Sequence, residues 1–431
     1  MLAPGFIDVH THDDVALIAT PGMEAKVSQS VTTVITGLCG YSAAPFAAGV
    51  APPAEYDILL RGAADRFETY AAYLAAVARA RPAVNWLGLV GHSTLRLSFM
   101  DALDRPADAA EVRRMGDLLE ESLCAGAIGL RSGLAYAMAE WASTGELIDL
   151  CRRMAPWSAP YVTHLRDEGD GLIDAVEEAL EIRRAAGVPV VFSHHKATGA
   201  ANHGRTRDSL ARIDAAAVTQ AVALDVYPYA YSSTALTREK AARGGWVVVT
   251  RSATRPDLAG RDLDEIAALL GCDREGAVDA LHPAGALYHL MAEEDVARVL
   301  AHPRTMIGSD GLPLDERPHP RLWGTFPRVL GCYVREEGLL TLEEAVRRMT
   351  GLPAEVFRLP DRGRIAAGYR ADLVLFNAEA VGDRATADAP ALPARGIHAV
   401  YVNARITAPG CGERLHPEPG LGETDDRRRA P

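Results

Sequence analysis

The stretch Gly5-Phe6-Ile7-Asp8-Val9-His10-Thr11-His12 joins an apolar run to two histidines that are separated by one residue. Side chains two residues apart on a β-strand point to the same face of the sheet. His10 and His12 would therefore share a direction, while Thr11 points away. The alternative is two unrelated polar residues in a loop, because short motifs of this kind also arise by chance. As a strand, the stretch predicts two imidazoles at one metal ion.

Four later apolar runs also lead to a residue that can bind a metal. They are 31–36 before Cys39, 161–163 before His164, 188–193 before His194 and His195, and 305–309 before Asp310. Cys39 comes 29 residues after His10, and His194 comes 30 residues after His164. Both intervals are close to the roughly 30 residues of one βαβ unit. The spacing predicts consecutive parallel strands.

Three further apolar runs bring the number of predicted strands to eight; they are 84–90, 127–130 and 222–227. Stretches with apolar residues at helical spacing lie between the runs, and those predicted as helices are 67–79, 109–123, 145–154 and 171–186. Eight βα units predict an α/β fold, a (β/α)8 TIM barrel, in which functional residues follow the strands. A doubly wound sheet is the alternative, but it would not bring five strand ends to one point.

Three of the candidate ligands, Cys39, His164 and His194, would meet at the mouth of this barrel. A lone cysteine is usually an inert small hydrophobe. At separate strand ends, however, one thiolate and two imidazoles match the ligands that zinc takes in proteins. The other cysteines form no Cys-x-x-Cys pair, so we interpret them as buried or incidental thiols. The sequence therefore predicts a zinc centre.

Longer motifs resemble the amidohydrolase superfamily and, within it, the N-acyl-D-amino-acid deacylases, which are also called D-aminoacylases. They are Val-Thr-Thr-Val-Ile-Thr-Gly-Leu-Cys-Gly (31–40), Thr-His-Leu-Arg-Asp-Glu (163–168), Ser-His-His-Lys (193–196), Asp-Val-Tyr-Pro-Tyr (225–229), Ile-Gly-Ser-Asp-Gly (307–311) and His-Pro-Arg-Leu-Trp-Gly-Thr-Phe-Pro (319–327). In that family a cysteine after strand two takes the place of the carboxylated lysine of dihydroorotases and hydantoinases. Cys39 fits this exchange, and the fourth predicted strand, 128–132, contains no lysine.

The resemblance implies a metal centre with one tight Zn²⁺ site and a weaker second site. The tight site would be held by Cys39, His164 and His194. The weaker site would be bordered by His10, His12 and Asp310 and bridged by Cys39. Asp310 would be the catalytic residue, first as general base and then as general acid.

The resemblance also implies residues that bind a small-molecule substrate. The α-carboxylate would be clamped by Lys196, Tyr227 and Arg321, and the pocket would be lined by Tyr136 and Ser233. Lys196 is one of only three lysines in the chain. An arginine such as Arg321 can make a bidentate pair with a carboxylate.

The implied activity is zinc-dependent hydrolysis of the linear amide bond of N-acyl-D-amino acids, which releases a carboxylic acid and a free D-amino acid. Two alternatives stay open. One is an inactive zinc-binding remnant of the family with a short N-terminal segment. The other is a cyclic-amide hydrolase of the hydantoinase type, which the absence of a strand-four lysine disfavours. Selectivity for the D-isomer rests on the resemblance alone.

The predicted domains follow from the same comparison of motifs. Residues 1–360 would form the barrel, with an insertion at about 235–300 that lies over its mouth as a lid. Residues 361–407 would form the remaining part of a small β-sandwich. We expect this domain to be incomplete, because the barrel motif begins within the first ten residues. Residues 408–431 are rich in Gly, Pro and charge, which predicts a disordered tail.

Composition narrows the class of protein. The chain has 431 residues, of which 48% are hydrophobic, so it can bury a large core. A net charge of −12 argues against a nucleic-acid partner. The sequence has no run of 18 apolar residues and no recognisable signal peptide, so we predict no membrane partner and a cytoplasmic location. No pattern indicates the oligomeric state.

Overall fold

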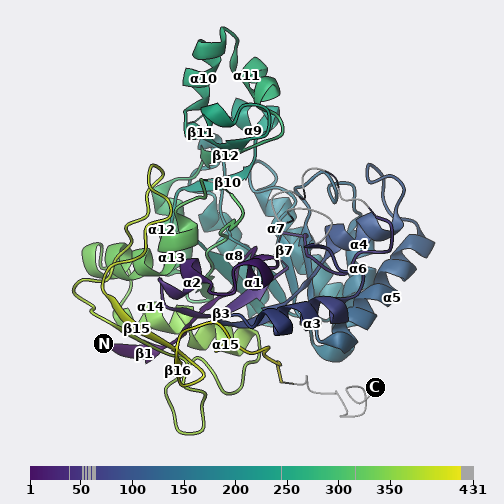
Figure 1. Ribbon diagram of the computed structural model, residues 1–431. Helices are drawn as coiled ribbons and strands as arrows, with labels where there is room; N and C mark the ends of the chain where they lie inside the picture. The colour runs from purple at the N-terminus through teal and green to yellow at the C-terminus, as the bar shows by residue number, and fades with distance from the viewer. Residues whose placement is uncertain are drawn as a thin grey trace.

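The computed structural model describes residues 1–37, 39–50, 53, 56, 60, 65–243, 245–315 and 317–418. A barrel of parallel strands lies at its centre and is surrounded by helices (Figure 1). Its strands are β2 (Phe6–Asp8), β3 (Val31–Thr36), β4 (Asn85–Gly88), β5 (Val90–Gly91), β6 (Leu130–Gly133), β7 (Tyr161–His164), β8 (Val190–Phe192), β9 (Val222–Val226) and β13 (Thr305–Ile307). The predicted TIM barrel is confirmed.

Hydrogen bonds join the two groups of parallel strands into a closed barrel. One group has the order β2-β3-β4, and the other has the order β13-β9-β8-β7-β6-β5. Leu89 interrupts a single barrel strand between β4 and β5, and its N–H donates to the carbonyl of Thr36 at 3.0 Å. A parallel bridge between Thr11 and Gly311 closes the opposite seam. Closure leaves no free sheet edge and gathers all the strand ends at one mouth.

The outer helices begin and end where the local sequence favours it. The longest, α5 (Ala109–Ala125), starts with a capping box between Asp108 and Glu111 and ends at Gly126, which has φ of 116°. The other helices of the wall are α3 (Tyr70–Ala80), α4 (His92–Phe99), α6 (Thr144–Met154), α7 (Leu172–Ala186), α8 (Thr206–Ala217), α12 (Glu293–Ala301), α13 (Arg321–Arg328) and α14 (Leu342–Met349). The predicted helices fall on α3, α5, α6 and α7.

Two apolar clusters position the barrel mouth. One packs the outward side of the strands against the helices, and the other fills the barrel interior. The interior cluster includes Val9, Val162 and Val191, and it is closed from below by Ala354 in α15 (Gly351–Val356) and by Phe357. This close-packed floor fixes the strand ends from which the candidate ligands project.

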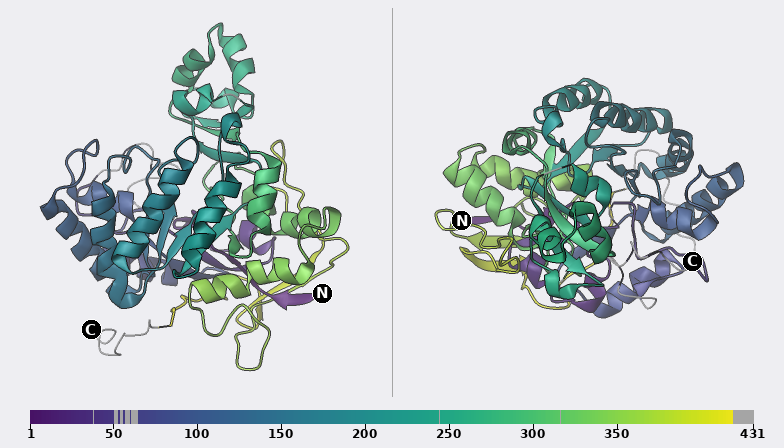
Figure 2. Two further views of the ribbon diagram at one scale, coloured as in Figure 1. Left: turned by 180° about the vertical axis from the view of Figure 1, so that it is seen from behind. Right: turned by 90° about the horizontal axis from the view of Figure 1, so that it is seen from above.

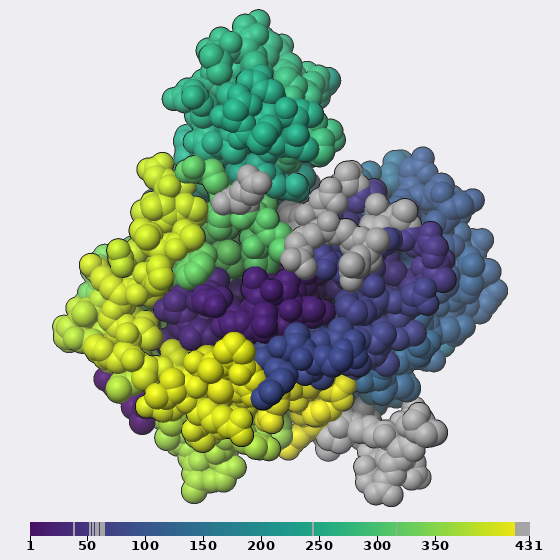
Figure 3. Space-filling view, viewed as in Figure 1, coloured from purple at the N-terminus to yellow at the C-terminus, as the bar shows by residue number. Residues whose placement is uncertain are grey.

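The insertion forms a separate lobe above the barrel (Figures 1 and 3). It consists of β10 (Tyr231–Ala235), α9 (Arg238–Ala242), β11 (Val247–Ser252), α10 (Leu263–Leu270), α11 (Arg274–Leu281) and β12 (Ala284–His289). Its apolar core is its own, and it lies over the barrel when seen from above (Figure 2). The sequence predicts an insertion at about 235–300, but α12 belongs to the barrel wall, where it packs against β9 and β13.

The small domain is a four-stranded sheet within the described residues. Its order is β1 (Leu2–Pro4), β14 (Leu373–Phe376), β15 (Ile397–Val402) and β16 (Arg405–Ile406), all antiparallel neighbours. Ala3, Val374 and Val400 are buried on its inner face. The first strand therefore pairs the start of the chain with residues 373–375.

The predicted disordered tail is wrong for residues 408–418. Gly412 donates to the carbonyl of Pro82 at 3.0 Å, and Leu415 donates to the carbonyl of Trp86 at 3.0 Å. This segment covers backbone groups of β4 that would otherwise be unpaired, and unpaired buried backbone is costly. Residues 419–431 lie outside the described residues. Among the helices that the structure describes, none has both the length and the hydrophobicity to cross a membrane.

Candidate metal centre and active site

Three of the predicted ligands have unusual backbone conformations. The φ angles are 57° at Cys39, 34° at His194 and 49° at Asp310, although non-glycine residues rarely adopt positive values. Gly133 allows the Cys39 backbone to approach β6, because a Cβ atom at residue 133 would lie 2.2 Å from the Cys39 carbonyl oxygen. Strained positions of this kind persist where the surrounding structure fixes them, and they cluster at functional sites.

Cys39, His164 and His194 form a compact buried group. The Cys39 Sγ atom lies 3.8 Å from His164 Nδ1 and 3.8 Å from His194 Nε2. Tetrahedral zinc, with bonds of about 2.3 Å to sulfur and about 2.1 Å to nitrogen, holds two such ligand atoms about 3.6 Å apart. The observed separations and the donor set therefore fit a single zinc ion.

A second group shares Cys39 and lies beside the first. The Asp310 Oδ1 atom is 3.0 Å from His10 Nε2 and 3.1 Å from His12 Nε2, and Cys39 Sγ is 3.6 Å from His10 Nε2. The ligand atoms within each group lie within 4.8 Å of one another. The structure thus brings together all six predicted metal ligands as two adjoining groups.

Two carboxylates that the sequence analysis did not identify orient the imidazoles. The Asp225 Oδ1 atom lies 3.0 Å from His10 Nδ1, and Glu168 Oε1 lies 3.1 Å from His194 Nδ1. In both histidines this leaves Nε2 directed to Cys39. Carboxylates in this position fix the ring orientation and raise the basicity of a ligating nitrogen. Asp225 and Glu168 lie within the quoted motifs, but their spacing does not predict that they contact histidines.

Electrostatics separate the two groups. Burial alone would raise the pKa of Cys39, but Arg131 and hydrogen bonds from the histidines hold this pKa well below its usual value. Burial lowers the pKa of His164 to about 4, so its ring is neutral and can ligate a metal. Burial and Arg131 also lower the pKa of His10, yet Asp225 and Asp310 raise it to about 10. A proton on His10 would compete with a metal ion at the second group.

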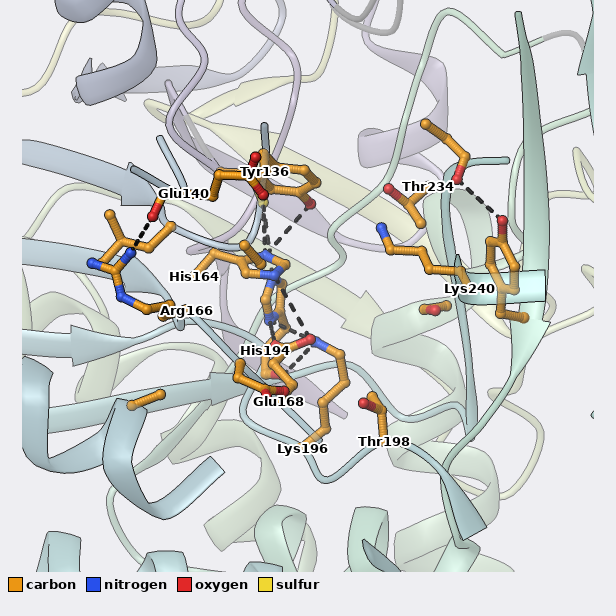
Figure 4. Close-up of a pocket in the computed structure, with 18 of the residues that line it drawn as sticks. Tyr136, Glu140, His164, Arg166, Glu168, His194, Lys196, Thr198, Thr234 and Lys240 are labelled. Carbon is orange, nitrogen blue, oxygen red and sulfur yellow. Dashed lines mark hydrogen bonds and ion pairs between the residues drawn. The ribbon is translucent and has the colours of Figure 1, made fainter. Parts of the chain in front are cut away.

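A cavity of about 910 Å³ opens from these groups to the surface below the insertion. Lys196, Tyr227, Arg321, Tyr136 and Ser233 all line it, as the sequence predicts. Figure 4 shows Lys196 beside His194 and Glu168, with Tyr136 over His164. The predicted substrate residues therefore surround the tight ligand group.

The clamp residues already have partners in the structure. The Lys196 ammonium is 2.6 Å from Glu168 Oε1, and Arg321 Nη1 is 2.8 Å from Asp310 Oδ2. The Tyr227 ring lies between these cations, 5.7 Å from Lys196 Nζ and 4.4 Å from the Arg321 guanidinium carbon. Both cations can therefore face one anion in the cavity.

A family model described as "Amidohydrolase family" matches residues 1–250 and 200–408. The chain belongs to the amidohydrolase family. A D-aminoacylase of Alcaligenes xylosoxydans xylosoxydans is 51% identical over 403 residues, which are 94% of this chain and 83% of that relative.

Two solved structures share this amidohydrolase fold almost throughout. One is a D-aminoacylase with a binuclear metal center, whose description names one-metal activation and second-metal attenuation. It matches with a TM-score of 0.93 and 48% identity, and the match covers 96% of this chain and 89% of that chain. An N-acyl-D-glutamate deacylase from Bordetella bronchiseptica, complexed with zinc and a phosphonate mimic of the tetrahedral intermediate, matches with a TM-score of 0.94, 45% identity and the same coverage.

The amidohydrolase site contains two cations to which the sequence analysis gave no role. Arg131 projects from β6 to the second ligand group, with Nη2 3.0 Å from His10 Nε2. Lys240 lines the cavity from α9, and its ammonium lies 5.6 Å from the centre of the Tyr136 ring. Arg131 lies in the fourth predicted strand, 128–132, which contains no lysine.

Proposed function

We propose that this amidohydrolase cleaves the amide bond of N-acyl-D-amino acids and that its metal is zinc. The observation that carries the proposal is the zinc-type group of Cys39, His164 and His194, which lies at the base of a cavity beside Lys196 and Arg321. A D-aminoacylase and an N-acyl-D-glutamate deacylase with nearly the same fold support it.

The tight ligand group would hold one zinc ion. Bound zinc lowers the pKa of water to about 7 and polarises a carbonyl group. Glu168 and Asp225 orient the histidine rings around the thiolate of Cys39. Cys39, His164 and His194 are all buried, and they line the base of the cavity.

Asp310 would move the protons. Burial raises the pKa of Asp310, but Arg321 and His10 hold it well below its usual value, so the carboxylate is ionised at neutral pH. When a substrate carboxylate takes Arg321 as its partner, the pKa of Asp310 rises. The carboxylate then becomes a better general base and, once protonated, can deliver the proton to the departing amine nitrogen.

Lys196 and Arg321 would bind the α-carboxylate of the substrate. The hydroxyls of Tyr227 and Ser233 have no hydrogen-bond partner within the described part of the chain and can donate to the same group. Two cations and two hydroxyls around one anion would hold the amide near Asp310. This arrangement favours an N-acyl amino acid over a simple amide, because a buried charge needs several partners.

An assay of zinc-loaded protein against matched N-acetyl-D and N-acetyl-L amino acids tests the proposal. We expect turnover of the D-isomers, and a fall of roughly 10²-fold in Asp310→Asn with zinc retained. Turnover of a cyclic amide such as dihydrouracil in place of the linear substrates would favour the hydantoinase alternative. Zinc binding with no hydrolysis of either class would favour the inactive remnant.

A refinement of the substrate concerns Lys240. Its ammonium points into the cavity opposite Glu168 (Figure 4), and no carboxylate in the described ranges pairs with it. The side chain is half-buried, so an unpaired charge there is unfavourable until a ligand supplies an anion. We propose that the preferred substrates carry a second carboxylate, as in N-acyl-D-glutamate.

The refinement is tested by comparing N-acetyl-D-glutamate with N-acetyl-D-methionine. Lys240→Met should lower kcat/KM for the glutamate substrate about tenfold, which is about 1.4 kcal/mol, and should spare the methionine substrate. Arg238→Met, which removes an exposed cation of the same helix, is the matched control. An equal loss for both substrates would contradict the refinement.

A further inference from the structure

Arg131 is a fully buried cation inside the barrel. It lies on β6, where its neighbours in register are Gly91 and Val162, and its exposed fraction is 0%. Val162 belongs to the apolar cluster of the barrel interior. The Arg131 side chain is therefore enclosed between this apolar floor and the ligand groups above it.

The guanidinium contacts the atoms that would bind a second metal ion. Its Nη2 atom is 3.0 Å from His10 Nε2, 3.4 Å from His10 Nδ1 and 3.7 Å from Cys39 Sγ. His10 Nε2 and Cys39 Sγ are also the atoms that face Asp310 and the tight group. A divalent ion bound to them would lie in direct contact with a fixed positive charge.

The side chain has no evident route away from these atoms. Neither Arg131 nor His10 lines the cavity, so the guanidinium would have to pass the layer of ligands to reach it. The Nε and Nη1 atoms of Arg131 have no hydrogen-bond partner within the described ranges, so no alternative carboxylate there draws the group aside.

We propose that Arg131 takes the place of a second metal ion and excludes one from the neighbouring ligand group. The inference rests on the proposed zinc site and concerns only its stoichiometry. The guanidinium supplies the positive charge on the side of the Cys39 thiolate that faces His10. Repulsion between like charges then excludes a divalent ion from the group of His10, His12 and Asp310.

The experiment is a zinc titration of chelator-treated protein at buffered free zinc concentrations, with bound metal counted by mass spectrometry. The parent should saturate at one zinc per chain, and Arg131→Met should bind two. Cadmium gives a second measurement, because the absorption of its thiolate bond should show one bound ion in the parent and two in the variant. Arg152→Met, which removes an arginine on the surface of α6, should remain at one.

The outcomes separate this inference from the proposed function. Two zinc ions of similar affinity in the parent, or one zinc in Arg131→Met, would overturn the inference and leave hydrolysis untouched. A parent that binds no zinc would overturn both. If Arg131→Met does not fold, Arg131→Gln offers a smaller neutral side chain for the same measurement.

Discussion

Arg96 and Arg131 are both fully buried, one between α4 and α6 and the other inside the barrel. The Arg96 Nη1 atom donates to both oxygens of Glu146 at 2.8 and 2.7 Å, and its Nε and Nη2 atoms donate to backbone carbonyls. His92 Nε2 completes this cluster at 2.8 Å from Glu146. Arg131, by contrast, leaves two of its nitrogens without a partner among the described residues.

The difference separates buried charge that stabilises the fold from buried charge that acts on the metal-ligand groups. Native proteins satisfy nearly all of their buried polar atoms, so an exception needs an explanation. Among the described residues several of the exceptions lie at the barrel mouth, including His12 Nδ1, Arg131 Nε and Nη1, Tyr227 OH, Ser233 Oγ and Arg321 Nε, whereas at the cluster of Glu146 the exception is His92 Nδ1. The cluster at Glu146 joins α4 to α6, whereas the unpaired atoms at the barrel mouth can bind other molecules.

The largest effect is expected from replacing Cys39, which lies in both ligand groups of the barrel mouth. Cys39→Ala removes the thiolate that both ligand groups share, so zinc content and activity should fall to background. The metal-free protein should lose less stability than Glu146→Gln does, because Cys39 Sγ contacts the buried Arg131 guanidinium at 3.7 Å, against 2.7 Å between Arg96 and Glu146. Metal analysis and denaturant unfolding of chelator-treated protein check this. A Cys39→Ala variant with full zinc content would contradict the assignment of Cys39 as a zinc ligand.

The reverse pattern is expected at the other buried cluster. Glu146→Gln leaves Arg96 and His92 without their anion, which should lower the free energy of unfolding by about 3 kcal/mol. Zinc content and kcat of the folded protein should remain at the parent level. Glu120→Gln, at a half-exposed ion pair with Arg153, is the control and should cost less than about 1 kcal/mol. Loss of zinc in Glu146→Gln would show that the two regions are coupled.

Acid unfolding should report the same cluster. Burial raises the pKa of Glu146, but His92 and Arg96 lower it to about 2 in the folded protein, against an ordinary value of 4.5. Because the folded pKa is depressed, this contribution to stability is complete above about pH 4.5 and is lost as the pH falls toward 2. Thermal unfolding across this range should show a steeper decline in the parent than in Glu146→Gln. Parallel curves would contradict the assignment.

The smallest effect is expected at Lys240, at the edge of the mouth. Burial lowers its pKa to about 8, so the ammonium is charged at pH 7 and loses its proton as the pH rises. The preference for N-acetyl-D-glutamate over N-acetyl-D-methionine should therefore decline severalfold between pH 7 and 9. Lys240→Arg, which keeps its charge, should retain the preference at pH 9. A preference that is independent of pH in the parent would exclude Lys240 as its source.

The sequence predicts the parts of this molecule that repeat or alternate. Eight apolar runs at regular spacing predict the barrel, and the residues after them predict candidate metal ligands, which only the resemblance to a known family divides into two groups. Arg131, Glu168 and Asp225 could not be assigned in this way, because their roles depend on which side-chain atoms meet across separate strands. Nor does a pattern of three residues predict that Leu2–Pro4 pairs with Leu373–Phe376, since strands so short carry almost no periodicity.

The closure of the barrel between Thr11 and Gly311 has a consequence for how the protein is made. During synthesis the ligands of the tight group have all emerged once residue 194 leaves the ribosome. The strand that carries His10 and His12 cannot gain its second neighbour until residue 311 follows, and β1 must wait for residues 373–376. Contacts so distant in sequence form slowly. We therefore expect the first strands of the chain to be among the last to form their native pairing. The metal centre would then assemble in two stages, first the group of Cys39, His164 and His194 and then the group that contains His10 and His12.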